Sequence, residues 1–196
     1  MDSNFFALIS RMRYIARWGL MRNALPENIQ EHSHMVAVLA HALGVIRRDI
    51  FRKPCDVNAL ATAALYHDAS EILTGDLPTP IKYHNAEIMS AYHAVEDLAV
   101  QKLLGMLPPE LRATYADVLA EDKGGDIYPL VKAADKLSAY IKCIEERKAG
   151  NNEFLSAEAQ TRAALEASPL PEVQYFLEHF IPAFERDLDE LGAIGQ

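Results

Sequence analysis

Residues 66–80, YHDASEILTGDLPTP, place an imidazole and two carboxylates within five positions. His67, Asp68 and Glu71 follow a run of small and apolar residues that begins at Ala59. On a helix, side chains three and four positions apart share a face, so these three groups would extend an apolar stripe. Charged groups at such a place are costly unless they are paired or bind a metal. The segment therefore indicates a candidate metal site at the end of a buried helix.

Two further expected helices carry matching groups. His32 lies on the inward apolar stripe of one helix, one turn before Val36. Asp135 lies near the middle of another, where aspartate is disfavoured because its carboxylate competes for backbone donors. With His67 and Asp68 they would supply two imidazoles and two carboxylates. That set suits a divalent first-row ion such as Mn²⁺, Co²⁺, Fe²⁺ or Zn²⁺.

Each of these residues also has an ordinary structural interpretation. His32 could be a hydrogen-bonded histidine in a first helical turn, and Asp135 could pair with a neighbouring lysine. Glu71 could be a solvated residue at a helix end. Four groups on three helices, in the order His, His-Asp, Asp, favour a metal site over the separate structural interpretations.

The other histidines give weaker signals. His34 and His41 share a stripe with two valines and are expected to be partly buried without a role in chemistry. His84 and His93 lie downstream of the His-Asp pair, where a second metal would take its ligands. Nothing in their spacing favours that, so the sequence predicts one ion.

Arg17 and Trp18 form a candidate clamp for an anionic ligand. The first 22 residues hold four arginines against a single acid in an otherwise acidic chain. Arg11 and Arg13 fit a solvated helix face. Arg17 is different because the only tryptophan of the chain follows it directly. A cation beside a rigid aromatic ring suits an anion that carries an apolar ring.

The elements that must position these groups are expected to be helices. Helical periodicity dominates, and alternating runs rich in Val, Ile and Thr are missing, so the predicted class is all-α. We expect a compact single-domain bundle of about seven to eight helices. The expected helices span residues 4–17, 28–50, 57–74, 85–106, 109–121, 128–149, 152–167 and 171–191.

Several expected helix ends carry residues that typically begin or end a helix. Asn28 and Glu31 predict a capping box at the start of one helix. Gly75 is suited to end the helix that carries His67, because glycine adopts positive φ at little cost. Pro109 and Pro129 suit first-turn positions, where a missing N–H does no harm.

The length, composition and net charge of the chain limit the class of protein. The chain has 196 residues, 50% of them hydrophobic, which is enough for one core, and we expect a single domain over residues 1–196. A net charge of −9 argues against binding to a nucleic-acid polymer, because an acidic surface repels phosphate backbones. Two cysteines are too few for a disulfide framework. No signal peptide or membrane span is recognisable, so the expected location is the cytoplasm, away from the membrane.

The order His32, His67-Asp68, Asp135 resembles the H…HD…D pattern of HD-domain metal phosphohydrolases. Four stretches are further similar to the bacterial 5′-deoxynucleotidases of that superfamily: RWGLMRN at 17–23, ENIQEHSHMVA at 27–37, YHDASEILTGDLPTPIKY at 66–83 and GNNEFL at 150–155. The resemblance spans nearly the whole chain. It implies a compact helical HD-type fold, usually a homodimer, that removes phosphate from 2′-deoxynucleoside 5′-monophosphates with a divalent cation.

The resemblance also implies roles for individual residues. The metal ligands would be His32, His67, Asp68 and Asp135, with Asp68 and Asp135 also beside the substrate. Glu71 would be the catalytic carboxylate, acting with Asp68 and with Arg17, which would orient the phosphate. Trp18 would form a wall against the sugar and select against ribonucleotides. The nucleoside would be lined by Asp76, Leu77, Pro78 and Thr79, with Asp76 accepting from the 3′-hydroxyl.

Two rival interpretations stay open. One is another HD phosphohydrolase, acting on deoxynucleoside triphosphates, a guanosine polyphosphate alarmone or a cyclic dinucleotide. A triphosphate would need more cations near the site than Arg17 supplies, and no Gly-Tyr-Pro motif of the cyclic-dinucleotide branch follows the His-Asp pair. The other is a non-catalytic helical interaction module. The intact set of four ligands argues against it, since a relic would be free to lose any of them.

Overall fold

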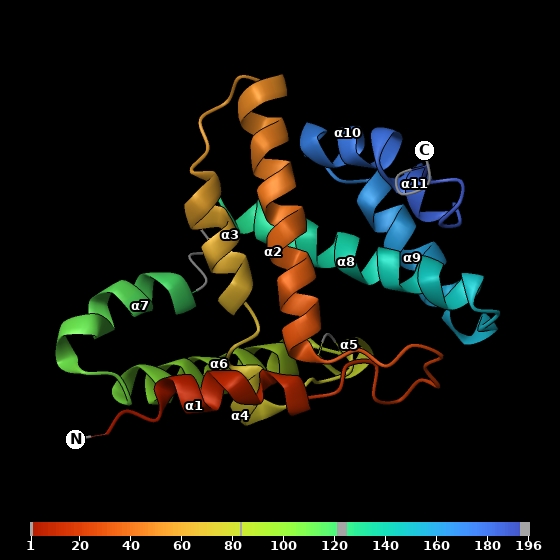
Figure 1. The fold of residues 1–196 in the computed structure, drawn as a ribbon. Helices are drawn as coiled ribbons and strands as arrows, with labels where there is room; N and C mark the ends of the chain where they lie inside the picture. The colour runs from red at the N-terminus through yellow and green to blue at the C-terminus, as the bar shows by residue number, and fades with distance from the viewer. Residues whose placement is uncertain (1, 83, 121–124, 193–196) are drawn as a thin grey trace.

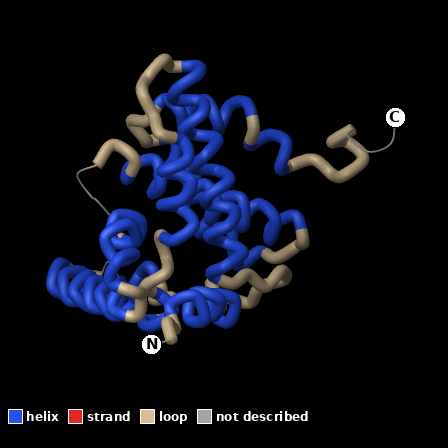
Figure 2. The backbone as a smooth tube through the Cα atoms, turned by 60° about the vertical axis from the view of Figure 1, so that its left-hand side comes forward, coloured by secondary structure: helices blue, strands red, loops and turns tan. Residues whose placement is uncertain are grey.

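The described part of the chain is helical. A computed structural model describes residues 2–82, 84–120 and 125–192, without the side chains of Thr79 and Pro80. Within these ranges the extended pairing is one isolated antiparallel bridge, between Ala16 and Asn28. Seven of the described helices have eight or more residues, which confirms the predicted all-α class (Figure 2). None of the described helices combines the length and apolar character needed to span a membrane.

The helices follow one another along the chain with short connections. The first half holds α1 (Phe5–Ile9), the 3₁₀ helix η1 (Ser10–Tyr14), α2 (Ile29–Val45), the π-helical η2 (Ile46–Ile50), α3 (Val57–Tyr66), α4 (Glu71–Thr74), α5 (Thr79–Lys82) and α6 (Ala86–Gly105). The second half holds the 3₁₀ helix η3 (Pro109–Leu111), α7 (Arg112–Leu119), α8 (Tyr128–Lys148), the 3₁₀ helix η4 (Asn152–Phe154), α9 (Leu155–Glu166), α10 (Pro171–His179) and α11 (Ile181–Phe184).

The predicted residues at the helix ends are confirmed. Asn28 accepts from the backbone of Gln30 and Glu31, and Glu31 accepts from the backbone of Asn28, which completes the capping box. Gly75 follows α4 with φ of +75°. Pro109 and Pro129 each occupy the first turn of a helix.

The helix expected over 4–17 ends at Tyr14, and two other predicted helices were too long by more than a turn. The last one, expected over 171–191, breaks at Phe180 and ends at Phe184. Pro182 explains the break, because it has no N–H for the carbonyl four residues earlier. The helix expected over 57–74 ends at Tyr66, and a turn over 67–70 separates it from α4. The short helix α5 follows four residues after α4.

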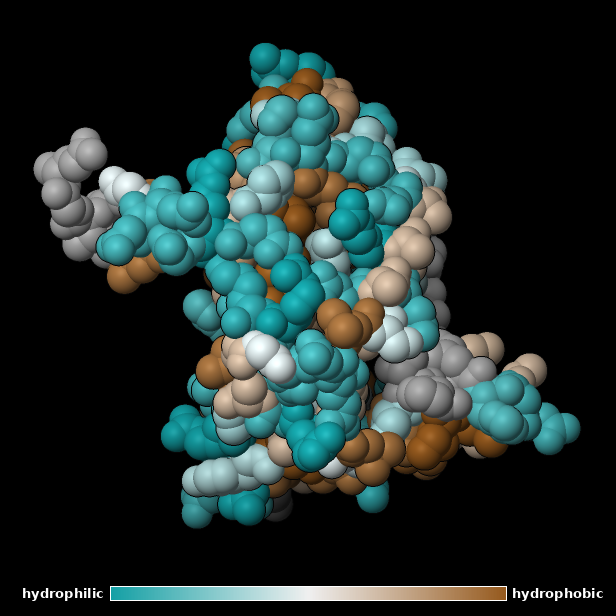
Figure 3. All heavy atoms as spheres, turned by 90° about the vertical axis from the view of Figure 1, so that its right-hand side faces the viewer, coloured by the Kyte–Doolittle hydropathy of each residue, from teal (hydrophilic) through white to brown (hydrophobic). Residues whose placement is uncertain are grey.

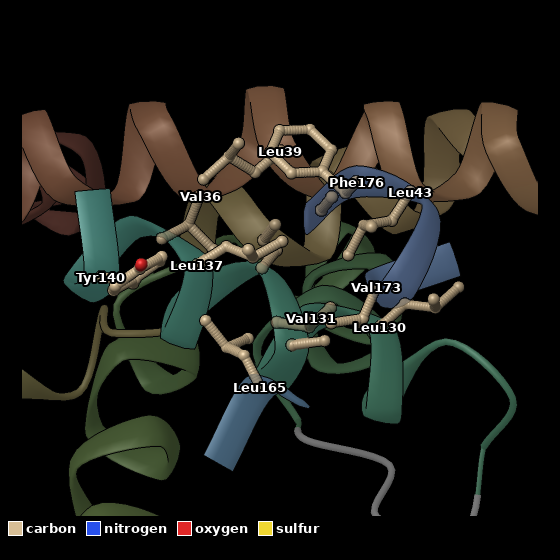
Figure 4. Packing of buried hydrophobic residues seen from close by; sticks show 14 of the residues in the cluster. Val36, Leu39, Leu43, Leu130, Val131, Leu137, Tyr140, Leu165, Val173 and Phe176 are labelled. Atoms are coloured by element: carbon tan, nitrogen blue, oxygen red, sulfur yellow. The ribbon is translucent and has the colours of Figure 1, made fainter. Parts of the chain in front are cut away.

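A central helix, α2, carries the main core. It stands upright in Figure 1, with α3 beside it, α8 crossing it, and α1, α4 and α6 below. In Figure 4 the α2 side chains Val36, Leu39 and Leu43 face Val131 and Leu137 of α8. Further buried residues of this cluster come from α3, α9 and α10. The burial confirms the inward stripe on which His32 was placed.

A second, smaller cluster forms beneath the first. It joins α1, α6 and α7 through Phe5, Ala69, Leu103, Leu104, Leu107 and Leu119. Ala64 belongs to the main cluster and Ala69 to the second one. His67 and Asp68 therefore lie where the chain passes from one core to the other.

The opposite side of α2 is open to solvent. His34 and His41 are exposed, so the expectation that they are partly buried was wrong. Val38, on the same side, is also half exposed, at 51%. Helices α3 and α8 pack on the side of α2 that carries His32. The side that carries His34, Val38 and His41 therefore stays uncovered. The face shown in Figure 3 is mainly hydrophilic, with hydrophobic side chains in scattered patches.

Candidate metal centre

Three elements bring the predicted ligands together. His32 lies in the first turn of α2, His67 and Asp68 follow the last turn of α3, and Asp135 lies in the middle of α8. His32, His67 and Asp135 each offer a ligand atom within 4.8 Å of the other two. His32 Nε2 lies 3.1 Å from Asp135 Oδ1.

Asp68 closes the group from the side of α3. Its Oδ2 atom lies 3.1 Å from His67 Nε2 and 3.6 Å from His32 Nε2. Consecutive residues on a helical backbone point about 100° apart, so the adjacent His67 and Asp68 can occupy neighbouring coordination positions. All four predicted ligands therefore face one another.

The Nδ1 atom of each histidine makes a contact that fixes the orientation of its ring. His67 Nδ1 donates to the carbonyl of Ala64 at 2.7 Å. His32 Nδ1 lies 3.2 Å from the hydroxyl oxygen of Ser138 on α8. A proton on each Nδ1 leaves the Nε2 lone pair free for a metal, which is the usual arrangement of ligating histidines.

The two Nε2 atoms fit a metal better than a proton. Both are buried and neither forms an aligned hydrogen bond, although carboxylate oxygens lie 3.1 Å away. A buried polar atom without an aligned partner costs free energy. A divalent cation between the imidazoles and the carboxylates would satisfy all of them at once, and nitrogen with hard oxygen donors suits such an ion.

The charges around the two aspartates keep them ionised. Burial alone would raise the pKa of Asp68, but His67, His32 and Arg17 outweigh it and hold the pKa well below its usual range. For Asp135, the neighbouring imidazoles of His32 and His67 likewise outweigh burial and lower the pKa. Ionised carboxylates are the form that binds a metal.

The candidate clamp lies beside this centre. Arg17 Nη1 is 3.5 Å from Asp68 Oδ2, and the Arg17 side chain is only 12% exposed. Trp18 has φ of +56°, a left-handed backbone conformation that residues other than glycine rarely adopt. The indole ring meets Phe154 edge-on, with ring centroids 5.3 Å apart. The turn thus presents the cation and the indole at the same side of the bundle.

Glu71 and Asp76 add two carboxyl groups next to the ligands. Glu71 opens α4, is buried, and its Oε2 atom has no hydrogen-bond partner. Burial, with the nearby charges of Asp68 and Asp76, raises the pKa of Glu71 to about 9. Burial also raises the pKa of Asp76, against the opposing effects of Arg17 and of the Trp18 backbone N–H.

The remaining predicted residues follow in the same segment. Leu77 and Pro78 are partly buried between α4 and α5. Thr79 begins α5, and its side chain lies outside the described residues. The segment from Asp76 therefore continues along the chain directly from the helix that carries Glu71.

Residues that the sequence did not single out hold the segment over 15–28 in place. Glu146 of α8 is fully buried and accepts from the backbone N–H groups of Ala24 and Leu25, at 2.8 and 3.0 Å. It also accepts from Asn151 and pairs with Lys142, which donates to the Leu25 carbonyl. The stretch GNNEFL contributes through Asn151, whose side chain donates to the Arg22 carbonyl.

The chain is similar to proteins of a known family. The family model of 5′-deoxynucleotidase YfbR-like proteins matches residues 4–184. A protein from Shigella boydii named 5′-deoxynucleotidase YfbR is 50% identical over 192 residues, which cover 97% of this chain and 96% of that protein. A protein of the same name from Escherichia coli K12 has the same identity and coverage.

Solved structures have the same fold. An HD-domain phosphohydrolase from Listeria innocua superposes with a TM-score of 0.82 at 23% identity, over 97% of this chain and 92% of that one. A cyanophage S-2L HD phosphohydrolase, DatZ, superposes with a TM-score of 0.59 at 25% identity, over 97% and 99% of the two chains. That protein is bound to dA and one catalytic Zn²⁺ ion.

Proposed function

This chain belongs to the YfbR-like family of 5′-deoxynucleotidases, and we propose that it hydrolyses 2′-deoxynucleoside 5′-monophosphates to deoxynucleoside and phosphate. The observation that carries this proposal is the convergence of His32, His67, Asp68 and Asp135 on one point beside Arg17. These four residues would hold one divalent cation. When bound, such an ion neutralises phosphate charge and lowers the pKa of water.

Arg17 and Glu71 have complementary tasks in this reaction. The guanidinium of Arg17 offers a planar fork to phosphate oxygens and offsets the repulsion from an acidic protein. Glu71, one turn after the His-Asp pair, moves a proton between the attacking water and the leaving 5′-oxygen. Its raised pKa suits this role, because a carboxyl group that keeps its proton near neutral pH can donate it to a leaving group.

Trp18 and Asp76 select the sugar in this proposal. The indole of Trp18 packs against the C2′ edge of the substrate, and Asp76 accepts from the 3′-hydroxyl. A ribose 2′-hydroxyl against the indole would lose its hydrogen bonds, which costs about 1–3 kcal/mol and reduces turnover about 5- to 150-fold. The DatZ complex with dA supports a deoxynucleoside site in this fold.

A substrate panel tests the proposal. Mono-, di- and triphosphates in ribo and deoxy forms are offered with Mn²⁺, Co²⁺, Zn²⁺ or Mg²⁺, and released phosphate is measured. We expect preference for dCMP over CMP and for dAMP over dATP, with activity lost in Asp68→Ala. Equal turnover of dCMP and CMP would remove the role of Trp18, and preference for dATP would move the protein to the triphosphate branch. A protein with no activity and no bound metal would be an interaction module.

The domain organisation, the oligomeric state, the location and the cation are also proposed. We propose that residues 1–196 form one HD-type domain, because the family match covers residues 4–184 and α3 connects the two hydrophobic clusters. A homodimer and a cytoplasmic location stay predictions from the resemblance and the composition. The identity of the cation is for the metal panel to decide, and Zn²⁺ is the ion of the cyanophage relative.

A further inference from the structure

Glu27 contacts both residues of the candidate clamp. Its Oε2 atom accepts from Arg17 Nε and from Trp18 Nε1, each at 3.1 Å. Its backbone carbonyl accepts from the Arg17 N–H at 3.0 Å. The Glu27 side chain is only 16% exposed, so water competes little for these bonds. One residue therefore holds the guanidinium, the indole and the backbone between them.

Glu27 does not occupy the Nη groups of Arg17 or the faces of the Trp18 ring. The bond to Glu27 uses Nε of Arg17, so the two Nη groups remain for other partners, and Nη1 lies 3.5 Å from Asp68. The bond from Nε1 fixes the rotation of the Trp18 ring, which also meets Phe154 edge-on. Charge-assisted hydrogen bonds of this kind are about twice as strong as neutral ones.

We propose that Glu27 is a positioning residue that couples phosphate recognition by Arg17 to sugar recognition by Trp18. This inference rests on the proposed function of the site. A fixed distance between the guanidinium and the indole sets where the C2′ edge lies when the phosphate is bound. Glu27 thereby makes discrimination between deoxyribose and ribose depend on correct seating of the phosphate.

The same contact protects the metal ligands. Arg17 already lies at ion-pair distance from Asp68. Without Glu27, the guanidinium is free to close on Asp68 with two hydrogen bonds and would then compete with the cation for a ligand. Holding Nε at Glu27 limits Arg17 to the single Nη1 contact with Asp68.

Three variants test the inference. Glu27→Ala removes both side-chain bonds. Glu27→Gln keeps a carbonyl oxygen with two lone pairs, which can still accept from both donors. Glu31→Gln is the matched control, because it removes one negative charge four residues later, from an exposed side chain that accepts from the Asn28 backbone N–H and not from Arg17 or Trp18. For each variant, kcat and KM are measured with dCMP and with CMP.

A second readout needs neither metal nor activity. Trp18 is the only tryptophan, so its fluorescence in the metal-free protein reports the clamp directly. We expect Glu27→Ala to shift the emission to longer wavelength and to increase quenching by acrylamide, because the indole loses its anchor. Glu31→Gln should keep wild-type emission, and Glu27→Gln should stay close to it.

The expected kinetic pattern is specific to positioning. Glu27→Ala should lose about 10- to 100-fold in kcat/KM for dCMP and about 10-fold in the dCMP/CMP ratio, while Glu27→Gln stays within about 3-fold. Equal ratios and equal fluorescence in Glu27→Ala and Glu31→Gln would overturn the inference. If Glu27→Ala does not fold, Glu27→Asp must show the same two changes, because its carboxylate is one methylene shorter, and wild-type behaviour would overturn the inference.

The inference and the proposed function fail in different ways. A wild-type protein that releases no phosphate from any deoxymononucleotide refutes the function. An active wild type whose dCMP/CMP ratio is unaffected by Glu27→Ala refutes only the coupling.

Discussion

Glu71 is a buried carboxyl group whose Oε2 atom has no hydrogen-bond partner. We expect Glu71→Gln to lower kcat about 10²- to 10⁴-fold, because the amide keeps the shape but cannot move a proton. Bound metal should stay at the wild-type level, since Glu71 lies outside the group of four ligands. Single-turnover phosphate release and metal content are measured on the same preparation.

The control for this experiment is Asp68→Ala, which should lose the metal and the activity together. Loss of metal in Glu71→Gln would instead make Glu71 a ligand. Unchanged phosphate release in Glu71→Gln would remove it from the reaction and leave the proton transfer to another group.

At the scale of single residues, the sequence predicted groups that interrupt a regular pattern. His32 lies on an apolar helical stripe and Asp135 lies inside a helix, so both were recognisable as exceptions. Glu27 has no such signal, because it lies in an irregular segment where no periodicity exists to be broken. Ser138 also could not be predicted as a site residue, because small polar residues are common in helices. Its role is seen only from the 3.2 Å distance between its hydroxyl oxygen and His32 Nδ1.

At the scale of elements, the end of α3 shows why the predicted helix over 57–74 was too long. The Ala64 carbonyl accepts from the His67 side chain at 2.7 Å, in competition with the backbone N–H that would continue the helix. The following bonds, from Ala69 to Tyr66 and from Glu71 to Asp68, span three residues rather than four. A propensity pattern cannot reveal this competition, because it depends on the rotamer of one histidine.

Close packing of α2 on α3 depends on Gly44. A Cβ atom at this position would lie 2.9 Å from Leu60 Cδ2 and 3.0 Å from Val57 Cγ1. Gly44→Ala gains about 1 kcal/mol of helix propensity but overpacks a buried contact, which costs about 1–3 kcal/mol. We expect a net loss of about 1 kcal/mol in the free energy of unfolding, measured by urea denaturation.

Gly105→Ala is the matched control for Gly44→Ala. Gly105 is the last residue of α6, and beyond its chain neighbours and its own helix backbone no atom of the described residues lies within 4 Å of the position that its Cβ would take. Its stability should stay the same or rise by up to about 1 kcal/mol. A stabilised Gly44→Ala protein would mean that Leu60 moves aside and that the α2–α3 contact is looser than its geometry implies.

At the scale of the whole molecule, a buried ion pair joins distant parts of the chain. Lys142 and Glu146 are four residues apart on α8, a spacing that usually marks a solvated pair on a helix surface. Here they are 4% and 0% exposed, and they hold the backbone of Ala24 and Leu25. The pair belongs to the tertiary structure, so the sequence alone could not distinguish it from a surface pair, whereas the helices themselves could be predicted.

This network makes stability depend on pH in a defined direction. Hydrogen bonds from Lys142, Leu25, Ala24 and Asn151 outweigh the effect of burial and lower the pKa of Glu146 from 4.5 to about 2. A carboxyl group with a lowered pKa in the folded state stabilises that state above its unfolded pKa. The contribution is therefore complete above about pH 5 and disappears as the pH falls toward 2.

The variant Glu146→Gln isolates this contribution, because it keeps an acceptor but no longer titrates. At pH 7 we expect it to unfold with roughly 2–3 kcal/mol less free energy than wild type. The difference should shrink between pH 5 and pH 2 as the wild-type carboxylate takes up its proton. Urea denaturation of both proteins in chelator, at several pH values, measures it.

Glu153→Gln is the control, because Glu153 pairs with Arg22 of the same 15–28 segment but at the surface, where ion pairs contribute little. A constant difference between wild type and Glu146→Gln across this pH range would show that packing, rather than charge, explains the effect of the substitution.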